Sequence, residues 1–465
     1  MITTYKTTKD ISADIFRAYD IRGIVDQELT PNSVYTIGRA IGSEAIAQNA
    51  REIIIARDGR LSGKHLSHAL AHGLIDSGCD VIDIGAVPTP VLYFATHELK
   101  TGSGVMLTGS HNPANYNGLK TMLAGHTLSE ETIQHLYQRI QKNDLTEAYG
   151  TFKNIDVTEA YIKRIADDVK LHRPLKIIVD AGNGITGELA PKLYRAMGCE
   201  VIELFCEIDG NFPNHHPDPS KPKNLQDLIV KVAKEKADIG FAFDGDGDRL
   251  GVITDRGEII AADRQLMLYA IDVLSRNPDA KIIYDVKCSR LLGEVITQHQ
   301  GEPVMWKTGH SLIKQKMKEL NVPLAGEMSG HIFFKERWYG FDDGLYTGAR
   351  LLEILSKEKL SAHDVFNRLP NAIATPEINI AMDDNKKFIF VETLAKNAKF
   401  EKATLFTIDG MRVEFSDGWG LIRCSNTTPC LVLRFEADNE AALQRIQTQF
   451  KQAILKQDPS IDVPF

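Results

Sequence analysis

The sequence predicts an α/β fold in which three similar α/β domains, with mixed and mostly parallel sheets, precede a smaller α+β domain. An apolar strand that ends in an acidic residue occurs three times along the chain. An amphipathic helical pattern and a second strand introduced by glycine follow it each time, and each copy then reaches a third apolar strand. Continuous apolar strands that alternate with helices are typical of parallel sheets covered on both faces. Repetition in one order indicates similar domains in series.

The strands of the three copies can be placed by residue number. The first strands are expected at 52–58, 176–180 and 281–285, the second at 78–83, 198–203 and 301–306, and the third at 104–107, 239–243 and 322–325. Because 465 residues are too many for one hydrophobic core, we expect domains at residues 1–155, 156–256, 257–369 and 370–465.

Local signals place further elements. Thr30 is expected to cap a helix whose first position is Pro31. Beyond residue 370 the strands alternate polar and apolar side chains, which predicts a small antiparallel α+β domain. Its elements are strands at 412–415, 421–423 and 430–435, a turn at 416–420, and a closing helix from about Asp438.

Composition excludes several classes of protein. A net charge of −8 and a pI of about 6.0 argue against a nucleic-acid surface, so any phosphate site must be a local cluster of Arg and Lys. The six cysteines form no CxxC pair, which is typical of reduced thiols. No signal peptide precedes Tyr5, and no apolar run approaches the ~20 residues of a membrane span. We therefore expect a cytoplasmic protein without nucleic-acid or membrane partners.

Polar loops follow the third strand of each copy, at 108–113, 244–249 and 326–331. Ligands of parallel α/β sheets bind beyond the carboxyl ends of the strands. We expect the three loops to face a common cleft and to offer three different chemistries to one substrate.

The first loop presents Ser110. Gly109 allows a tight turn, and Pro113 disfavours helix at the preceding residue, so the loop stays open. A serine raised on a turn beside His111 and Lys120 is typical of a covalent nucleophile. The alternative is an ordinary polar loop in which the serine caps a helix.

The second loop alternates acids with glycines, at Asp244, Asp246 and Asp248. Three carboxylates spaced by two residues can converge on one ion, and all-oxygen ligands favour Mg²⁺ or Ca²⁺. The loop is not an EF-hand, because Asp255 stands where the bidentate Glu would be. Arg249 could neutralise a developing phosphoryl charge. The alternative is a solvated acidic turn.

Two further loops carry polar clusters. The segment 423–428 sets one arginine among hydroxyl and amide side chains, which suits a phosphate, although a polar hairpin loop would look alike. In the third loop, Glu327, Ser329 and His331 would point to one side of an extended stretch. The carboxylate and hydroxyl could hold sugar hydroxyls, and the imidazole could move a proton. Lys287 and His310 could line the same cleft.

Together these loops resemble the α-D-phosphohexomutase family, in its bacterial phosphomannomutase/phosphoglucomutase branch. The residues that carry the resemblance are 108–113, 244–249, 326–331 and 423–428, in that order and separated by domain-sized gaps. The resemblance covers the whole chain. It implies four domains around a central cleft.

The resemblance also implies a mechanism. Ser110 would carry a phosphoryl group and, with Asp244, Asp246 and Asp248, hold Mg²⁺. The enzyme would interconvert hexose 1-phosphates and hexose 6-phosphates through a hexose 1,6-bisphosphate, which also serves as activator. We expect hexose phosphates as its partners and a monomer or weak dimer.

Individual residues take implied roles from the family. Arg22, Lys120, His331 and Arg249 would serve proton transfer or transition-state charge. The implied substrate-binding residues are Tyr19, Lys287, His310, Glu327, Ser329, Arg423, Ser425, Asn426 and Thr427.

Three alternatives stay open at this point. Phosphoglucosamine mutase is the nearest, and Met328 and Gly109 favour the mannose/glucose branch over it. A non-catalytic hexose-phosphate sensor is disfavoured because the serine, the three acids and Arg249 are all present. A phosphatase would lack a second phosphate site, which the fourth-domain loop supplies.

Overall fold

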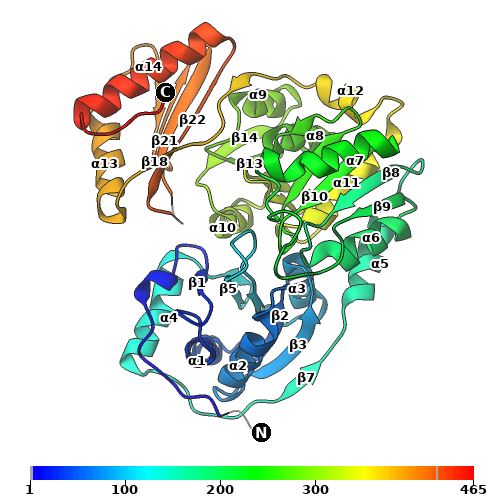
Figure 1. Ribbon diagram of the computed structural model, residues 1–465, viewed down its shortest axis with the longest axis vertical. Helices are drawn as coiled ribbons and strands as arrows, with labels where there is room; N and C mark the ends of the chain where they lie inside the picture. The colour runs from blue at the N-terminus through cyan, green and yellow to red at the C-terminus, as the bar shows by residue number, and fades with distance from the viewer. Residues whose placement is uncertain (1–3, 426–427) are drawn as a thin grey trace.

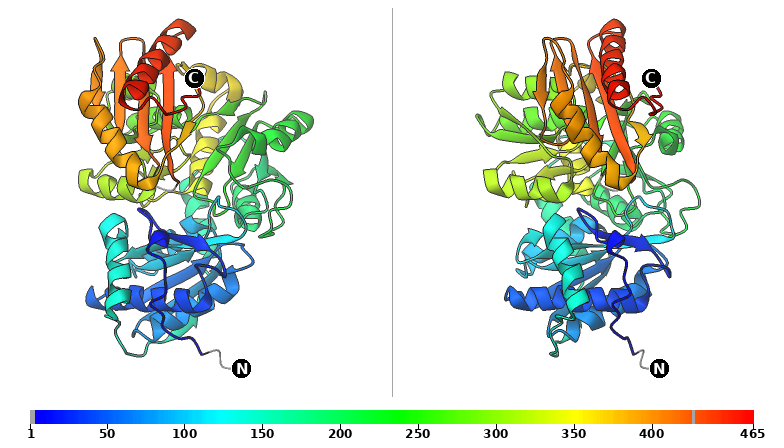
Figure 2. Two further views of the ribbon diagram at one scale, coloured as in Figure 1. Left: turned by 60° about the vertical axis from the view of Figure 1, so that its left-hand side comes forward. Right: turned by 90° about the vertical axis from the view of Figure 1, so that its left-hand side faces the viewer.

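A computed structural model describes residues 4–425 and 428–465 of the chain. These residues form four sheets that succeed one another along the sequence. The blue N-terminal part lies at one end of the molecule, the green and yellow parts lie beyond it, and the orange and red C-terminal part stands against the third sheet's domain (Figures 1 and 2). Within the described residues, no helix is long and apolar enough to cross a membrane.

The first three sheets repeat one strand order. The strands run β4–β2–β3, β10–β8–β9 and β15–β13–β14, and all neighbours within these trios are parallel. An antiparallel strand then pairs with the third strand of each copy, namely β5, β11 and β16. The predicted repeat of α/β domains is therefore confirmed, as parallel trios extended by antiparallel strands. Each of the three polar loops joins two antiparallel strands, so the loop at Ser110 is followed by a strand and does not cap a helix.

The first sheet and its helices take up the N-terminal third of the chain. The strands are β1 (Ile21–Ile24), β2 (Glu52–Arg57), β3 (Asp80–Ala86), β4 (Gly104–Leu107), β5 (Tyr116–Leu123), β6 (His126–Thr127) and β7 (Phe152–Asn154), and the helices are α1 (Pro31–Ala47), α2 (Gly63–Ile75), α3 (Thr89–Glu98) and α4 (Glu130–Lys142). Alternate residues of β2 enter different cores, Ile53 and Ile55 on one face and Ile54 on the other. Thr30 caps α1 as predicted, through Ser33 N.

The second and third domains follow the same plan. The second contains α5 (Thr158–Asp168), β8 (Lys176–Asp180), α6 (Thr186–Ala196), β9 (Glu200–Leu204), α7 (Gln226–Glu235), β10 (Ile239–Phe243), β11 (Leu250–Thr254) and β12 (Ile259–Ile260). The third contains α8 (Ala262–Leu274), β13 (Lys281–Asp285), α9 (Arg290–Gln298), β14 (Glu302–Trp306), α10 (His310–Leu320), β15 (Leu324–Gly326), β16 (Ile332–Phe334), α11 (Gly344–Lys357) and α12 (Ala362–Asn367).

The fourth sheet is antiparallel throughout its described pairings, which confirms the predicted α+β domain. It contains β17 (Ile373–Ala374), β18 (Ile378–Ala381), β19 (Thr404–Phe406), β20 (Met411–Phe415), β21 (Gly418–Cys424) and β22 (Cys430–Ala437), with α13 (Asp384–Asn397) and α14 (Glu440–Gln457). The turn predicted at 416–420 is shorter, because Gly418 already pairs with Phe415 in the ladder.

The hydrophobic cores show how firmly the domains are joined. One continuous core links the first three domains, where Phe94 of α3 packs against Tyr161 of α5 and Trp338. The fourth domain has a core of its own. It meets the third through a small apolar cluster of Val286, Trp419 and Leu421. The first three domains therefore form a common body, and the fourth is attached to it through a smaller and more polar contact.

Candidate active site

Ser110 lies at the carboxyl end of β4 with an exposed fraction of 1%. Its φ of +46° is left-handed, a conformation that costs a residue with a Cβ on the order of 1–2 kcal/mol. The amide of Ser110 donates to Thr108 Oγ1 at 2.8 Å, which helps to hold this turn. The hydroxyl donates to Asp244 Oδ2 at 2.9 Å and lies 3.1 Å from His111 Nδ1. The serine of the first domain thus meets the acidic loop of the second.

Arg60 holds the serine loop in place through hydrogen bonds to its backbone. Its guanidinium donates to the carbonyls of Ser110 (2.8 Å), Asn112 (2.7 Å), Pro113 (2.5 Å) and Tyr116 (2.9 Å). Asp58 pairs with Arg60 at 3.2 Å and accepts from the Thr108 hydroxyl at 2.8 Å. Sequence reasoning noticed Asp58 only as an acid that ends a strand, and it missed Arg60. The repeated strand-end acid was the available signal, because Asp285 likewise accepts from Met328 N in the third loop.

The serine and acidic loops approach each other closely. A Cβ on Gly245 would lie 2.3 Å from the carbonyl oxygen of Ser110, so only glycine fits there. The glycines of the acidic loop therefore allow contact with the serine loop as well as tight turns.

The three carboxylates converge. Asp244, Asp246 and Asp248 are fully buried, and each offers an oxygen within 4.8 Å of the others. Among the described residues Asp246 Oδ1 has no hydrogen-bond partner, and the polar neighbours of Asp248 Oδ1 are His331 Nε2 at 3.3 Å and Arg249 Nε at 3.9 Å. Buried oxygens without partners are costly unless a cation is bound, so this oxygen-only donor set fits a hard divalent ion. The predicted convergence is confirmed, and the solvated acidic turn is wrong.

Lys120, from β5, supplies a positive charge to the same cluster. Its Nζ lies 2.7 Å from Asp246 Oδ2 and 2.5 Å from Asp248 Oδ2. Burial would lower the pKa of Lys120, but these two carboxylates raise it well above its usual value. Burial and the two neighbouring acids raise the pKa of Asp244. Burial would raise the pKa of Asp248, but Lys120 and His331 outweigh it and hold that pKa well below its usual range.

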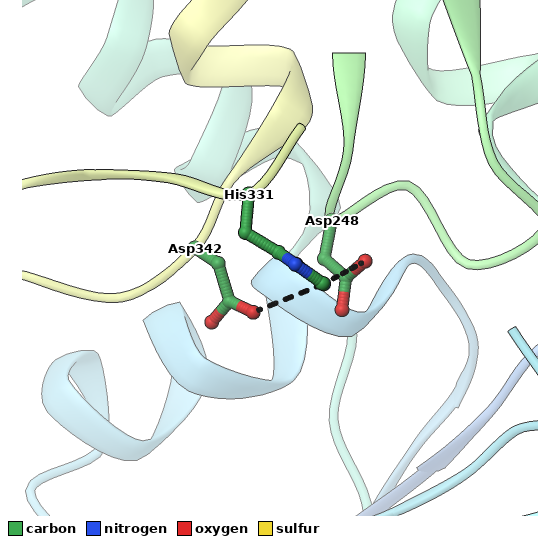
Figure 3. A group of neighbouring side chains, drawn as sticks. All are labelled: Asp248, His331 and Asp342. Atoms are coloured by element: carbon green, nitrogen blue, oxygen red, sulfur yellow. Dashed lines mark ion pairs between the residues drawn. The ribbon is translucent and has the colours of Figure 1, made fainter. Parts of the chain in front are cut away.

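His331 joins the acidic loop to the third loop. Figure 3 shows its ring between Asp248 and Asp342, with Nε2 3.3 Å and 3.9 Å from their oxygens. On the other side, Nδ1 lies 3.2 Å from Glu327 and 2.9 Å from Ser329 Oγ. Burial and Arg249 lower the pKa of His331, but the acids outweigh them and raise it to about 9.

The third loop is a turn rather than the extended stretch that the sequence suggested. Residues 327–330 leave β15 in a turn in which Gly330 has a φ of +101°. The carboxylate of Glu327 accepts from Gly309 N at 2.6 Å. Glu327, Ser329 and His331 still meet, because the turn rather than strand alternation brings their polar atoms together.

Arg249 and Arg22 approach this cluster from two domains. Arg249 Nε lies 3.8 Å from Asp244 Oδ2 and 3.2 Å from His331 Nε2. Arg22 donates to Asn112 Oδ1 at 2.7 Å and pairs with Asp20, so it lies against the serine loop.

Tyr19 of the N-terminal domain and His310 of the third domain are in contact. The Tyr19 hydroxyl donates to Thr308 O at 2.7 Å, and its ring meets the His310 ring edge-on. Burial and the charge of Lys314 hold the pKa of His310 well below its usual value.

The predicted phosphate loop lies at the end of β21. Arg423 Nε donates to Asp409 Oδ2 at 3.0 Å. The Ser425 hydroxyl lies 2.8 Å from Thr428 Oγ1, whereas Asn426 and Thr427 fall outside the described residues. Lys387, which sequence reasoning missed, donates to the carbonyls of Ser425 (2.5 Å) and Thr428 (3.0 Å).

Lys287 stands at the junction of the third and fourth domains. Its Nζ lies 2.9 Å from Glu377 Oε1. Arg434 of the fourth domain donates to the carbonyl oxygen of Lys287, and the charge of Lys287 also acts on Glu327 of the third loop. Lys287, Arg423 and Ser425 are thus held around the third-to-fourth domain contact, whereas Ser110, the three acids, Lys120, Arg249 and His331 form one connected cluster.

The arrangement offers a nucleophilic hydroxyl, an oxygen-lined cation site and several positive groups in one buried cluster. These are the parts that phosphoryl transfer requires, because such catalysis rests on positioning and on stabilising negative charge. The loop that carries Arg423 lies in the fourth domain, apart from this cluster. Its guanidinium is suited to bind a second phosphate.

Comparison with known proteins supports this interpretation. The phosphoglucomutase/phosphomannomutase family models for alpha/beta/alpha domains I, II and III and for the C-terminal domain match residues 13–147, 159–257, 261–373 and 377–453.

Individual relatives are similar over almost the whole chain. A phosphomannomutase/phosphoglucomutase of Pseudomonas aeruginosa is 57% identical over 455 residues, which cover 98% of each chain. A phosphoglucomutase of Neisseria meningitidis is 55% identical and covers 98% of this chain and 99% of its own. A crystal structure of a family member from Burkholderia thailandensis superposes with a TM-score of 0.94, at 53% identity and with 98% and 100% coverage. The chain belongs to the phosphoglucomutase/phosphomannomutase family of phosphohexose mutases.

Proposed function

We propose that this protein interconverts hexose 1-phosphates and hexose 6-phosphates through a phosphorylated Ser110, with mannose and glucose as accepted sugars. The observation that carries the proposal is the contact of the Ser110 hydroxyl with Asp244, inside a buried cluster of three acids, Lys120, Arg249 and His331. The names of the relatives from Pseudomonas and Neisseria support the sugar assignment.

The resident ion proposed for this cluster is Mg²⁺. Asp244, Asp246 and Asp248 would hold it together with the phosphoryl group on Ser110, and the convergence of their carboxylates, with the unpartnered Asp246 Oδ1, fits such an ion. When bound, Mg²⁺ supplies positive charge that neutralises the phosphoryl oxygens. Few protein ligands and one phosphate oxygen are typical of Mg²⁺ sites.

The chain's own residues perform the proposed transfer. A free hydroxyl of the hexose phosphate attacks phosphorus on Ser110, the phosphorus–Oγ bond breaks, and a hexose 1,6-bisphosphate forms. In net terms the proton of that hydroxyl moves to Ser110 Oγ, which leaves as a free hydroxyl. His331, Lys120 and Arg22 are proposed to relay this proton or to stabilise charge in the transition state. Arg249 faces the acids and stabilises charge on the transferring group. The bisphosphate then reorients and returns its other phosphoryl group to Ser110.

The substrate is proposed to lie in a central cleft among the four domains, between Ser110 and the loops of the third and fourth domains. Arg423 and Ser425, with Asn426 and Thr427, would hold the phosphate that does not react. Glu327 and Ser329 would hold sugar hydroxyls. Tyr19, Lys287 and His310 would complete the cleft. We also propose the domain limits 1–155, 156–256, 257–369 and 370–465, a monomer or weak dimer, and hexose 1,6-bisphosphate as the activator.

The test is a comparison of kcat/KM for mannose 1-phosphate, glucose 1-phosphate and glucosamine 1-phosphate, with Mg²⁺ and catalytic glucose 1,6-bisphosphate. Comparable values for mannose and glucose with little activity on glucosamine support the proposal. A preference for glucosamine would overturn the sugar assignment and leave the phosphoserine chemistry in place. Hydrolysis of the sugar phosphate without isomerisation would overturn the mutase reaction itself.

A further inference from the structure

A crevice of about 610 Å³ lies between the N-terminal and third domains. The N-terminal domain contributes α3, the end of β5, β6 and the residues that lead into α4, and the third domain contributes α10 and the segment 335–341. Figure 1 shows α10 between these two parts of the molecule, next to β5. Cavities of roughly 300–1,000 Å³ are the size that small ligands occupy.

Positive charge collects at the crevice, although one of its lysines, Lys314, pairs with Asp342 at 2.9 Å. Lys314, Lys318 and Lys335 line it, and no acid does among the residues that the structure describes. Lys318 Nζ lies 3.2 Å from His126 Nε2, and Lys335 Nζ donates to the neutral Asn321 side chain at 2.5 Å. In the described part of the chain neither Lys318, which is exposed, nor Lys335, which is half-buried, is within 4.0 Å of a carboxylate. An anion would complement this charge.

Aromatic rings form one wall of the crevice. The His97 ring stacks on Tyr339 at 4.8 Å and 20°, and Tyr339 is parallel to Phe341 within 4°. His97 is exposed and Tyr339 is half-buried, so solvent reaches this group of rings. A flat ring added to these rings would gain the apolar contact and stacking energy of aromatic pairs.

An unpartnered hydroxyl faces the same space. Ser311, in the first turn of α10, lines the crevice with an exposed fraction of 2%, and its Oγ has no hydrogen-bond partner among the described residues. A buried hydroxyl without a partner is destabilising, and a hydrogen bond to a ligand would recover that loss.

The crevice and the candidate active site share elements but no residues. His310 begins α10 on the active-site side, whereas Ser311, Lys314 and Lys318 of the same helix line the crevice. In the same way, β5 carries Lys120 to the acidic cluster and Met122 to the crevice. A phosphate-bearing probe could reach either place, so the two sites must be distinguished by competition.

We propose that this crevice binds a small phosphorylated aromatic molecule, of which a nucleoside monophosphate is the simplest example. Lys318 and Lys335 bind its phosphate, Ser311 bonds to a polar edge, and the ring lies against His97 and Tyr339. This site is separate from the hexose-phosphate cleft and does not depend on the proposed mutase reaction.

The experiment is calorimetric titration of the full-length protein with adenosine monophosphate, in the presence of saturating glucose 1,6-bisphosphate to fill the active site. Adenosine and inorganic phosphate are the reference probes. The double variant Lys318→Met, Lys335→Met removes both charges. Lys316→Met is the matched control, because Lys316 lies on the same helix but stacks on Trp306 and pairs with Glu319 instead.

We expect the monophosphate to bind despite the bisphosphate, at least tenfold more tightly than adenosine or phosphate alone. The double variant should weaken binding at least tenfold, and Lys316→Met should not. Unchanged mutase activity in the double variant would show that it is folded. The proposal is overturned if the monophosphate fails to bind the wild type, if the bisphosphate displaces it, if the double variant binds equally well, or if adenosine binds as tightly.

Discussion

The carboxylate of Asp409 accepts a hydrogen bond from the guanidinium of Arg423, at 3.0 Å. The same oxygen accepts from the backbone amide of Thr308, also at 3.0 Å, so it joins the fourth domain to the third. Thr308 in turn accepts from the Tyr19 hydroxyl of the N-terminal domain. Three domains therefore meet at one residue beside the proposed phosphate loop.

Arg423→Ala should raise KM for 1-phosphate and 6-phosphate substrates alike, by about tenfold or more. The reason is that a charge-assisted hydrogen bond to the non-reacting phosphate contributes roughly 1.5–3 kcal/mol. Steady-state kinetics in both directions measures this. Arg445→Ala, at an exposed ion pair of the same domain, is the control. A loss confined to one substrate would show that the loop serves only one orientation.

Ser110→Ala should abolish turnover while hexose phosphate still binds. The alanine lacks the oxygen that would carry the phosphoryl group, whereas the other polar groups of the cleft are left in place. Intact-mass spectrometry should find one phosphoryl group on the wild type and none on the variant, and calorimetry should find similar sugar-phosphate affinity. Ordinary turnover in the variant would be incompatible with a covalent phosphoserine.

Arg60→Lys should lower kcat at least tenfold and leave KM nearly unchanged. The substitution keeps the charge but loses the planar donor set that contacts four carbonyls of the serine loop. The serine would then be less well positioned, while the phosphate loop is untouched. Arg57→Lys is the matched control, because Arg57 ends β2 three residues before Arg60. A larger change in KM than in kcat would contradict this positioning role.

Mg²⁺ should raise the melting temperature of the wild type and not that of Asp246→Asn. An ion that binds only the folded state stabilises it by mass action. Asp246 contributes the carboxylate oxygen that has no partner among the described residues, and the substitution removes a ligand and a charge. Asp227→Asn, on α7 away from the cluster, should respond like the wild type. Removal of Mg²⁺ by a chelator should lower mutase activity in proportion to the metal lost.

The ion pair of Glu377 with Lys287 should raise the free energy of unfolding near neutral pH, and this contribution should be lost in strong acid. The charge of Lys287 lowers the pKa of Glu377 to about 2. A carboxyl whose pKa is lower in the folded state stabilises above its unfolded pKa, near 4.5, and that contribution is lost as pH falls toward 2. The difference in unfolding free energy between the wild type and Glu377→Gln should therefore shrink from pH 5 to pH 2. Urea unfolding at several pH values measures it, and a difference that grows on acidification would contradict the assignment.

The sequence by itself determined the repeated α/β plan, the antiparallel character of the last domain and the position of each polar loop. These features are local. Apolar runs such as 239–243 specify buried strands through burial on both faces, and the acids or the serine that follow lie at strand ends for the same reason.

Only the tertiary structure decided which of these residues meet. The Ser110–Asp244 and Lys120–Asp248 contacts join residues more than a hundred positions apart, and no periodicity encodes such distances. The sequence did not predict that Arg60, Asp409 and Lys387 hold site loops in place. Each hydrogen-bonds to a loop that only folding brings next to it. The turn at 327–330 replaced an expected extended stretch because Gly330 adopts a positive φ, which sequence alternation alone does not reveal.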